Sequence, residues 1–380
     1  MADVFDQIFG QPRVRDFLRA SVTTEHVTHA YLFTGPAGSN KTQSAYALAA
    51  ALLCEHGGCG SCAVCEKVAK KKHPDVRYYA PEGAGGYLID QVREIVSDTA
   101  LAPIQSTRKI YILDRVDLLG TAAANAFLKT LEEPPEDVVL VLLGRTRESV
   151  LPTIVSRCSV VPFRHIPASE AAGILSQRTG ADPGLAKIAI EACGGSITRG
   201  IEFLKSNERL AFRMRVLDML ARLGEADMWD VLSEASELVV LAKAPLDTVR
   251  AAHEAQLAEN TDFLERSAIR QIEMRNKREL SAKSLESFRQ ITAITASWLR
   301  DVLAVCSDAS ELVINYDVRA QIEEVASRTD EARVVRALSA VHDCDTAISY
   351  NVSPETCLDT LLFEIGEALY GTHSPRKIVL

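Results

Sequence analysis

Short apolar runs alternate with amphipathic helical patterns along the first 165 residues. Unbroken apolar runs are typical of parallel strands that are covered on both faces. Helical patterns lie between the runs, including an Ala- and Leu-rich stretch from Gln43 to about Cys54. Alternation of this kind predicts a parallel α/β sheet. The predicted strands are Tyr31–Thr34, Val76–Tyr79, Lys109–Asp114, Val138–Leu143 and Val160–Phe163.

From Pro167 onwards the pattern changes to helices only. A small block from Ala168 to about Lys205 precedes longer helical patterns that run from Glu208 to about Tyr370. Pro245 and Pro354 interrupt these longer patterns. The predicted fold class is therefore α/β followed by all-α. An apolar content of 47% with only 6% aromatic residues fits packed, helix-dominated cores.

Length, charge and cysteine content narrow the possible functions. A chain of 380 residues favours two or three domains, and a net charge of −9 means that any DNA contact must be local. The segment 266–289 holds seven Arg and Lys against three Glu, but a solvated helix face explains it more simply than DNA binding. No apolar run reaches membrane-spanning length, and the N-terminus lacks a signal pattern, so we expect a cytoplasmic protein. Nine cysteines in that compartment indicate reduced thiols or a metal.

A phosphate-binding loop is the first candidate site. The strand Tyr31–Thr34 leads into a small-residue loop that ends in Lys41 and Thr42 at a helix start. In such loops backbone N–H groups attract phosphate, the lysine reaches the β- and γ-phosphates, and the hydroxyl ligates Mg²⁺. Asn40 stands where the pattern has its second glycine. Asparagine tolerates left-handed backbone angles, but its side chain takes space that a phosphate needs, so we expect the loop to form without tight nucleotide binding.

The end of the third strand carries the second part of this site. Asp114 follows the run Lys109–Leu113, where P-loop NTPases place the aspartate of the Mg²⁺ shell. A turn residue is the simpler explanation, but the order after the phosphate loop favours the metal role. Arg115 stands where a glutamate would polarise water, and a guanidinium stays protonated at neutral pH. The sequence therefore predicts no intrinsic ATPase activity and leaves binding of ATP and Mg²⁺ open. The candidate nucleotide-binding residues are Gly35, Gly38, Asn40, Lys41, Thr42, Asp114 and, at a later helix start, Arg199.

Four cysteines in twelve residues form a candidate metal centre. Their spacing is C-x₄-C-x₂-C-x₂-C, with glycines that favour a tight knuckle. Four soft ligands this close match tetrahedral Zn²⁺, whereas unrelated surface thiols would leave a reactive cluster exposed. Four thiolates leave no open coordination position, so the site is predicted to be structural. The ligands are Cys54, Cys59, Cys62 and Cys65.

Several sequence blocks, in order, resemble the clamp-loader subunits of bacterial DNA polymerase III, which belong to the AAA+ class. The resemblance is specific over about residues 5–205 and weaker afterwards. It implies a P-loop domain over 1–165 with the zinc module at 54–65, a helical lid over 166–207 and a helical collar over 208–380. The blocks are His29–Pro36, the cysteine insert, Ile89–Arg93, Ala122–Pro135, Leu151–Cys158 and Asn351–Pro354.

The same resemblance implies a role in loading a sliding clamp onto primed DNA within a five-subunit ring. Three positions that serve ATP hydrolysis in active family members carry different residues here. They are Asn40, Arg115 and, at the usual sensor position, the run Gly144–Thr146. The trans-acting motif around Arg157 is intact. The resemblance therefore implies a non-hydrolysing subunit whose Arg157 serves as an arginine finger for a neighbouring ATPase subunit.

Other functions stay open at this point. An active ATPase subunit of the same machine would keep Lys41, Thr42 and Asp114 but would have to function with Asn40 and Arg115. A P-loop kinase of small nucleotides would need an acceptor pocket and lid arginines, whereas this chain continues into a long helical region. Arg157 could instead form a structural ion pair with Glu132 or Glu133.

Overall fold

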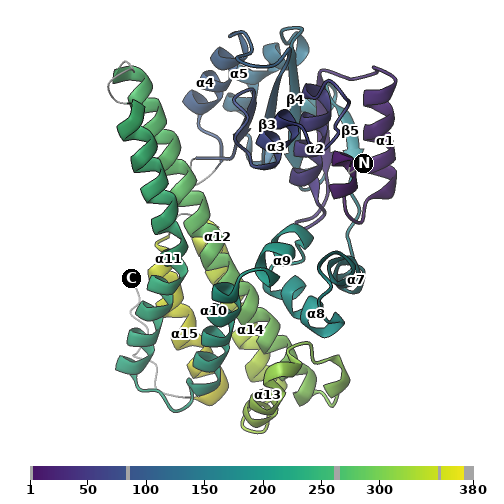
Figure 1. Ribbon diagram of the computed structural model, residues 1–380. Helices are drawn as coiled ribbons and strands as arrows, with labels where there is room; N and C mark the ends of the chain where they lie inside the picture. Colours follow the sequence, from purple (N-terminus) through teal and green to yellow (C-terminus); the bar gives the residue numbers. More distant parts are fainter. Residues whose placement is uncertain (1–2, 83–85, 261–265, 350–351, 372–380) are drawn as a thin grey trace. The chain divides into compact units, whose positions relative to one another are not determined.

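The computed structural model describes residues 3–82, 86–260, 266–349 and 352–371 (Figure 1). The chain forms two compact units, Met1–Gly180 with Gly195–Arg199, and Ala181–Gly194 with Gly200–Leu380. The finer division at residues 165 and 207 stays a prediction. Within the described ranges, we find no helix that combines the length and the apolar character needed to cross a bilayer.

A five-stranded sheet forms the centre of the first unit, and all of its strand pairs are parallel. This confirms the predicted sheet, with strand ends within two residues of those expected. The strand order is β2-β3-β4-β1-β5. Every residue of the three central strands is buried, which is why their sequences read as unbroken apolar runs. The strands are β1 (Ala30–Thr34), β2 (Val76–Tyr79), β3 (Lys109–Leu113), β4 (Val138–Gly144) and β5 (Ser159–Pro162).

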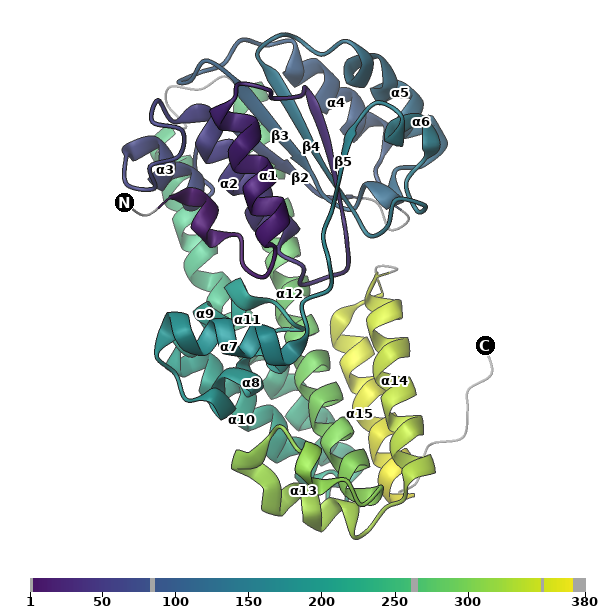
Figure 2. The ribbon, with the colours of Figure 1, turned by 90° about the vertical axis from the view of Figure 1, so that its right-hand side faces the viewer.

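Helices cover both faces of this sheet (Figure 2). Side chains alternate across each strand, so Tyr31 and Phe33 of β1 pack in one core and Leu32 packs in the other. The apolar spacing of the helix Pro12–Thr23 predicts Val14, Phe17 and Leu18 on one buried face, but Phe17 is 44% exposed and the buried residues are Val14, Leu18 and Ser21. One face carries η1 (Val4–Gln7), α1 (Pro12–Thr23), α2 (Lys41–Leu53) and α3 (Ala63–Ala69), and the other carries η2 (Val116–Leu118), α4 (Ile89–Thr99), α5 (Thr121–Glu132) and α6 (Pro152–Val155).

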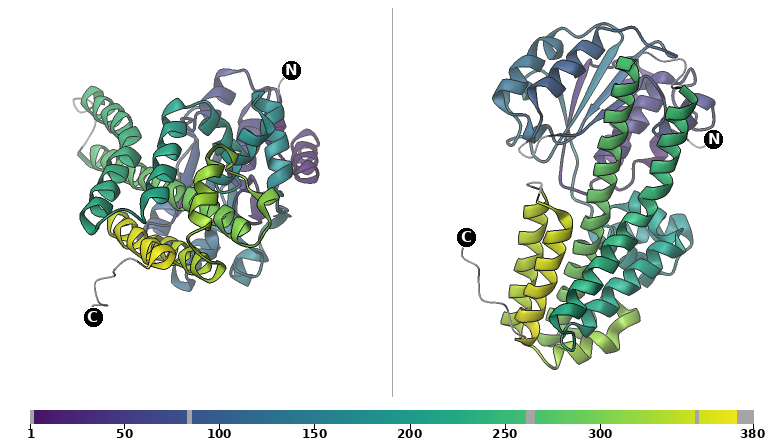
Figure 3. Two further views of the ribbon diagram at one scale, coloured as in Figure 1. Left: turned by 90° about the horizontal axis from the view of Figure 1, so that it is seen from below. Right: turned by 90° about the vertical axis from the view of Figure 1, so that its left-hand side faces the viewer.

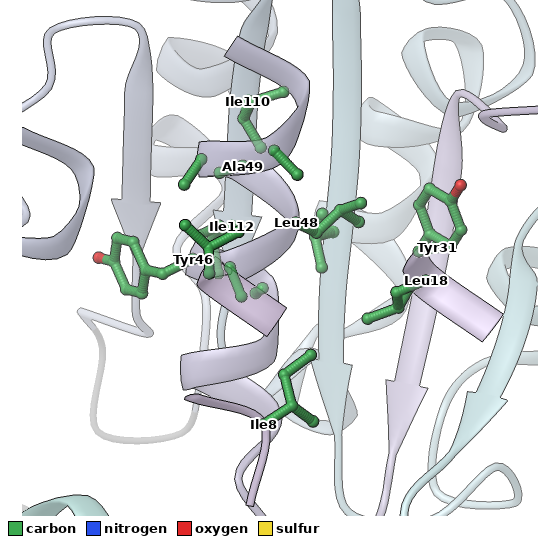
Figure 4. Packing of buried hydrophobic residues seen from close by; sticks show 14 of the residues in the cluster. Ile8, Leu18, Tyr31, Tyr46, Leu48, Ala49, Ile110 and Ile112 are labelled. Atoms are coloured by element: carbon green, nitrogen blue, oxygen red, sulfur yellow. The ribbon is translucent and has the colours of Figure 1, made fainter. Parts of the chain in front are cut away.

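The helix α2 is the most deeply packed of these helices. Nine of its thirteen residues are buried, and Leu48 and Ala49 are fully so. Small alanines let the helix lie close to the sheet, where Ile110 and Ile112 of β3 meet it (Figure 4). This packing fixes the N-terminus of α2 at the carboxyl end of β1, where the phosphate loop lies.

Helices alone build the second unit, as the sequence predicted. Long helices α11, α12, α14 and α15 lie side by side (Figure 3), and Trp298 of α12 is fully buried. Pro354 begins a helix as expected, whereas Pro245 lies inside α11, where buried Ala242 and Leu246 hold the helix on both sides. The elements are α8 (Pro183–Ala192), α10 (Asn207–Arg222), α11 (Met228–Asn260), α12 (Arg266–Cys306), η3 (Ser310–Leu312), η4 (Tyr316–Val318), α13 (Arg319–Ala326), α14 (Glu331–Ser349) and α15 (Pro354–Tyr370).

Two sequence features fall partly outside the described residues. The basic segment 266–289 lies in α12, but the side chains of Arg266, Arg270, Arg275 and Arg278 are not among those described. Its contact with DNA therefore stays a prediction. Asn351, in the last of the sequence blocks, is also outside the described residues.

Candidate nucleotide site and metal centre

The phosphate loop has the predicted strand–loop–helix form. Asn40, the residue before α2, has φ 74° and ψ 17°. It thus adopts the left-handed conformation that glycine usually provides, as the sequence suggested. Its side-chain amide donates a hydrogen bond of 3.0 Å to the carbonyl oxygen of Gln7 in η1. This contact ties the loop to the N-terminal segment, while the obstruction of phosphate by Asn40 stays a prediction.

Lys41 is folded back onto its own loop. Its Nζ donates to the carbonyl oxygens of Gly35 and, at 2.8 Å, Pro36. Burial lowers the pKa of Lys41, and the nearby Asp114 and Asp117 carboxylates oppose this effect. The neighbouring residue Thr42 stands half-buried in the first turn of α2. The ammonium is therefore held at the loop and faces the acidic end of β3.

Asp114 lies at the carboxyl end of β3 with both carboxylate oxygens engaged. The Tyr78 hydroxyl donates to Oδ2 at 2.7 Å, and the backbone N–H of Arg115 donates to Oδ1 at 2.9 Å. Arg115 itself adopts a left-handed conformation, with φ 52° and ψ 47°. Asp117 accepts a hydrogen bond of 3.2 Å from the backbone N–H of Arg145, which brings the loop after β4 to this site.

These residues meet the needs of a Mg²⁺–nucleotide only in part. A lysine, a hydroxyl and an aspartate stand in the order that such a site needs. However, the Asp114 carboxylate is occupied by Tyr78, and Arg115 supplies no base. The sequence reasoning missed Tyr78 and Asp117. The signal for Tyr78 lay in the pairing of two parallel strands, which the sequence pattern does not specify.

Arg199 lies in α9 (Ile197–Leu204), where its backbone N–H donates to the Ser196 hydroxyl at 3.4 Å. The helix α7 (Ala168–Thr179) belongs to the first unit, as does Arg199. A contact between Arg199 and nucleotide stays a prediction.

The four cysteines converge as the spacing predicted. Their sulfur atoms all lie within 4.8 Å of one another, and the Cys54 Sγ is 3.8 Å from Cys59 and 3.7 Å from Cys62. A tetrahedral zinc with Zn–S bonds of about 2.3 Å has sulfur–sulfur edges of about 3.8 Å, so these ligands fit that metal. The nine cysteines all lie in the described ranges, and none of them forms a disulfide.

Local backbone geometry shapes this cluster. Cys54 follows the end of α2, Cys62 caps α3 and Cys65 lies within α3, so two helices hold three of the four ligands. Gly58 has φ 102°, and an added Cβ would lie 2.5 Å from a Val4 methyl group, so no larger residue fits there. Hydrogen bonds from the backbone of Ser61 and Cys62 lower the pKa of Cys59 to about 6, which favours the thiolate that a metal needs.

Arg157 lies on the surface between α6 and β5. Its Nε donates to Glu132 Oε1 at 2.7 Å, and the side chain is 32% exposed. The same guanidinium donates to the Thr153 carbonyl oxygen at 2.8 Å and to the Ser156 hydroxyl at 3.1 Å. The ion pair that the sequence left open as an alternative therefore exists. Arg157, Glu132 and Ser156 line a shallow surface depression of about 420 Å³ together with His29, Leu131 and Cys158.

Comparison with known proteins gives consistent matches. A family model described as "DNA polymerase III, delta subunit" matches residues 10–167. The tau subunit of DNA polymerase III from Bacillus subtilis is 34% identical over 177 residues, covering 46% of this chain and 31% of tau. The delta' subunit from the same organism is 29% identical over 212 residues, covering 55% of this chain and 64% of delta'. Among solved structures, a gamma subunit-related protein from Thermotoga maritima has a TM-score of 0.46 and 18% identity, covering 93% of this chain and 99% of that one.

The parallel sheet, with a phosphate loop at the end of β1, is the fold of a P-loop domain. Residues 10–167 are similar to the DNA polymerase III subunits of the matched family model, and the relatives described above are tau and delta' subunits of that polymerase. The chain spans less than two thirds of the length of the two relatives described above. Similarity to both delta' and tau leaves its particular role to be argued from the site.

Proposed function

We propose that this chain is the delta' subunit of the DNA polymerase III clamp loader, a subunit that does not hydrolyse ATP and supplies Arg157 to a neighbouring ATPase subunit. Its partners would be the tau or gamma subunits and delta in a hetero-pentameric ring, together with the sliding clamp and, through the ring, primed DNA. The loading reaction places this protein in the cytoplasm. The lid at 166–207 and the collar at 208–380 belong to the same proposal.

The position of Arg157 at one end of the sheet carries this proposal. Tyr31 of β1 pairs with Ser159 of β5, and the two strands run parallel. Arg157 precedes β5 and therefore lies at the amino ends of the strands, beside His29. The phosphate loop follows Thr34 at the opposite, carboxyl end, about 16 Å away for five residues at roughly 3.3 Å each. A guanidinium placed there is directed away from its own nucleotide site and can act only on another molecule.

The ion pair with Glu132 does not oppose this role. Both side chains are partly exposed, at 32% for Arg157 and 47% for Glu132. Surface ion pairs typically contribute about 0–1 kcal/mol, so the guanidinium can leave Glu132 at low cost. A γ-phosphoryl group carries more negative charge than one carboxylate and accepts the planar donors of arginine well. Glu132 thus serves to hold the guanidinium ready.

The local chemistry supports a silent nucleotide site in this chain. Arg115 stands in place of a general base, and Lys41 donates to its own loop. An active ATPase of the tau type is the alternative, favoured by the presence of Lys41, Thr42 and Asp114 in a correctly formed loop. That alternative requires turnover by the isolated chain.

A structural zinc completes the proposed function. Four thiolates fit its tetrahedron and leave no position for a substrate. The metal would join the end of α2 to α3 and so brace the helix that carries Lys41. Binding of zinc to such a short loop is expected to be coupled to its folding.

Two variants in the reconstituted ring test the proposal. Arg157→Ala should fold and assemble, but it should lower DNA-stimulated ATP hydrolysis by the adjoining subunit by at least about tenfold, because arginine fingers in GTPases contribute roughly 10³–10⁵ in rate. Glu132→Gln is the matched control, since it breaks the same ion pair and leaves the guanidinium in place. If both variants lower hydrolysis equally, or if both only reduce stability, the pair is structural and the proposal is wrong.

A further inference from the structure

The pairing of β2 with β3 places the side chain of Tyr78 next to the carboxylate of Asp114. Tyr78 of β2 lies opposite Ile112 of β3 in the register, and Asp114 is two residues beyond Ile112 on the same side of the strand. The phenol therefore reaches the carboxylate and donates to Oδ2 at 2.7 Å. The other oxygen, Oδ1, accepts the backbone N–H of Arg115.

Neighbouring groups hold this tyrosine in place. Its ring is stacked with that of Tyr46 on α2, with centroids 6.4 Å apart and planes 21° apart, and Figure 4 shows Tyr46 projecting from that helix. The Lys71 ammonium lies 5.5 Å from the centroid of the Tyr46 ring. Desolvation and the Asp114 charge raise the pKa of Tyr78, so its hydroxyl remains a donor at neutral pH.

We propose that Tyr78 keeps Asp114 out of a Mg²⁺ shell, so that this site takes nucleotide phosphates without a divalent cation. The inference rests on the proposed function, in which Lys41 and Asp114 belong to a nucleotide site. Mg²⁺ demands near-octahedral oxygen ligands at about 2.0–2.1 Å and gives up its waters reluctantly. The phenol at 2.7 Å takes one lone-pair site of Oδ2 and places its hydroxyl group beside this oxygen, so Mg²⁺ has to compete with Tyr78 for the carboxylate. Lys41 remains to neutralise phosphate charge.

Nucleotide binding with and without Mg²⁺ tests the inference directly. Fluorescent ATP is titrated into the full chain in EDTA and again in Mg²⁺, and the ratio of the two dissociation constants is the readout. Tyr78→Phe removes the hydroxyl and keeps the ring, whereas Tyr46→Phe removes a nearby hydroxyl for which no hydrogen bond to Asp114 is found. Tyr78 is 42% exposed, so both Phe and a second replacement, Tyr78→Leu, are expected to fold.

The wild type and Tyr46→Phe should bind about equally with and without Mg²⁺. Tyr78→Phe should bind about tenfold or more tightly when Mg²⁺ is present, since hydrogen bonds to charged groups have effects of that size. Equal Mg²⁺ dependence in all three proteins overturns the role of Tyr78 and leaves the proposed function intact. Absence of nucleotide binding in every protein and both buffers overturns the nucleotide site as well.

Discussion

The buried carboxylate of Asp75 gives the sharpest stability prediction. Asp75 is fully buried where the chain enters β2, and its Oδ1 accepts the Ile104 N–H at 2.6 Å. Its Oδ2 accepts the N–H groups of Gln105 and Ser106, each at 2.8 Å. The carboxylate thus holds the segment that leads into β3, the strand that ends at Asp114.

We predict that Asp75→Asn destabilises the first unit by about 3 kcal/mol. The amide keeps one oxygen for two N–H groups but turns its NH₂ towards the third, leaving one buried donor unpaired at a cost of about 1–3 kcal/mol. The two remaining hydrogen bonds also lose charge assistance, which contributes about as much again. For a unit of this size the change corresponds to a loss in Tm of roughly 6–12 °C.

Unfolding in denaturant can locate this loss within the molecule. Both tryptophans, Trp229 and Trp298, belong to the second unit, so their fluorescence reports that unit while far-UV circular dichroism reports both. Asp75→Asn should move the dichroism transition and leave the tryptophan transition in place. Asp90→Asn, an exposed change whose side chain is 91% accessible, is the control and should change little.

The pH dependence gives a second check on the same residue. Burial would raise the pKa of Asp75, but the three backbone hydrogen bonds outweigh it and hold the pKa below its ordinary value. The stabilisation is therefore present above the unfolded pKa of about 3.9 and is lost as the pH falls through the folded pKa. The difference in the free energy of unfolding between the wild type and Asp75→Asn should therefore disappear at acid pH. A gap that is absent at neutral pH, or constant down to acid, would refute the reasoning.

The remaining predictions concern metal and turnover. Protein purified without added zinc should carry about one equivalent of Zn²⁺, and Cys62→Ser should lose it; a variant with unchanged metal content contradicts the assignment. The isolated chain should hydrolyse ATP at the background rate because Arg115 replaces the base, and turnover that disappears in Lys41→Ala would show an active ATPase instead.

Much of the first unit could be predicted because the patterns of neighbouring residues in its sequence agree with the folded structure. Strands such as Val138–Gly144 are buried on both faces and therefore read as continuous apolar runs. The left-handed conformation of Asn40 followed from the loop pattern, and the cysteine cluster followed from ligand spacing. Each of these features depends on residues that are close together in the sequence.

Features that depend on strand register could not be predicted. Tyr78 and Asp114 are 36 residues apart and meet only because β2 pairs with β3 in one particular register. The contacts of Asp75 with the segment before β3 depend on the same pairing. Phe17 was misplaced because helical periodicity marks an apolar stripe but not how far round the helix burial extends.

The most direct test of the central claim compares two variants of this chain in the same reconstituted ring. Arg157→Ala removes the group proposed to act on a neighbour, and Lys41→Ala removes the lysine of this chain's own phosphate loop. DNA-stimulated ATP hydrolysis by the adjoining ATPase subunit should fall by at least about tenfold with Arg157→Ala and stay at the wild-type rate with Lys41→Ala. The opposite pattern, with hydrolysis lost in Lys41→Ala and unchanged in Arg157→Ala, would contradict the account.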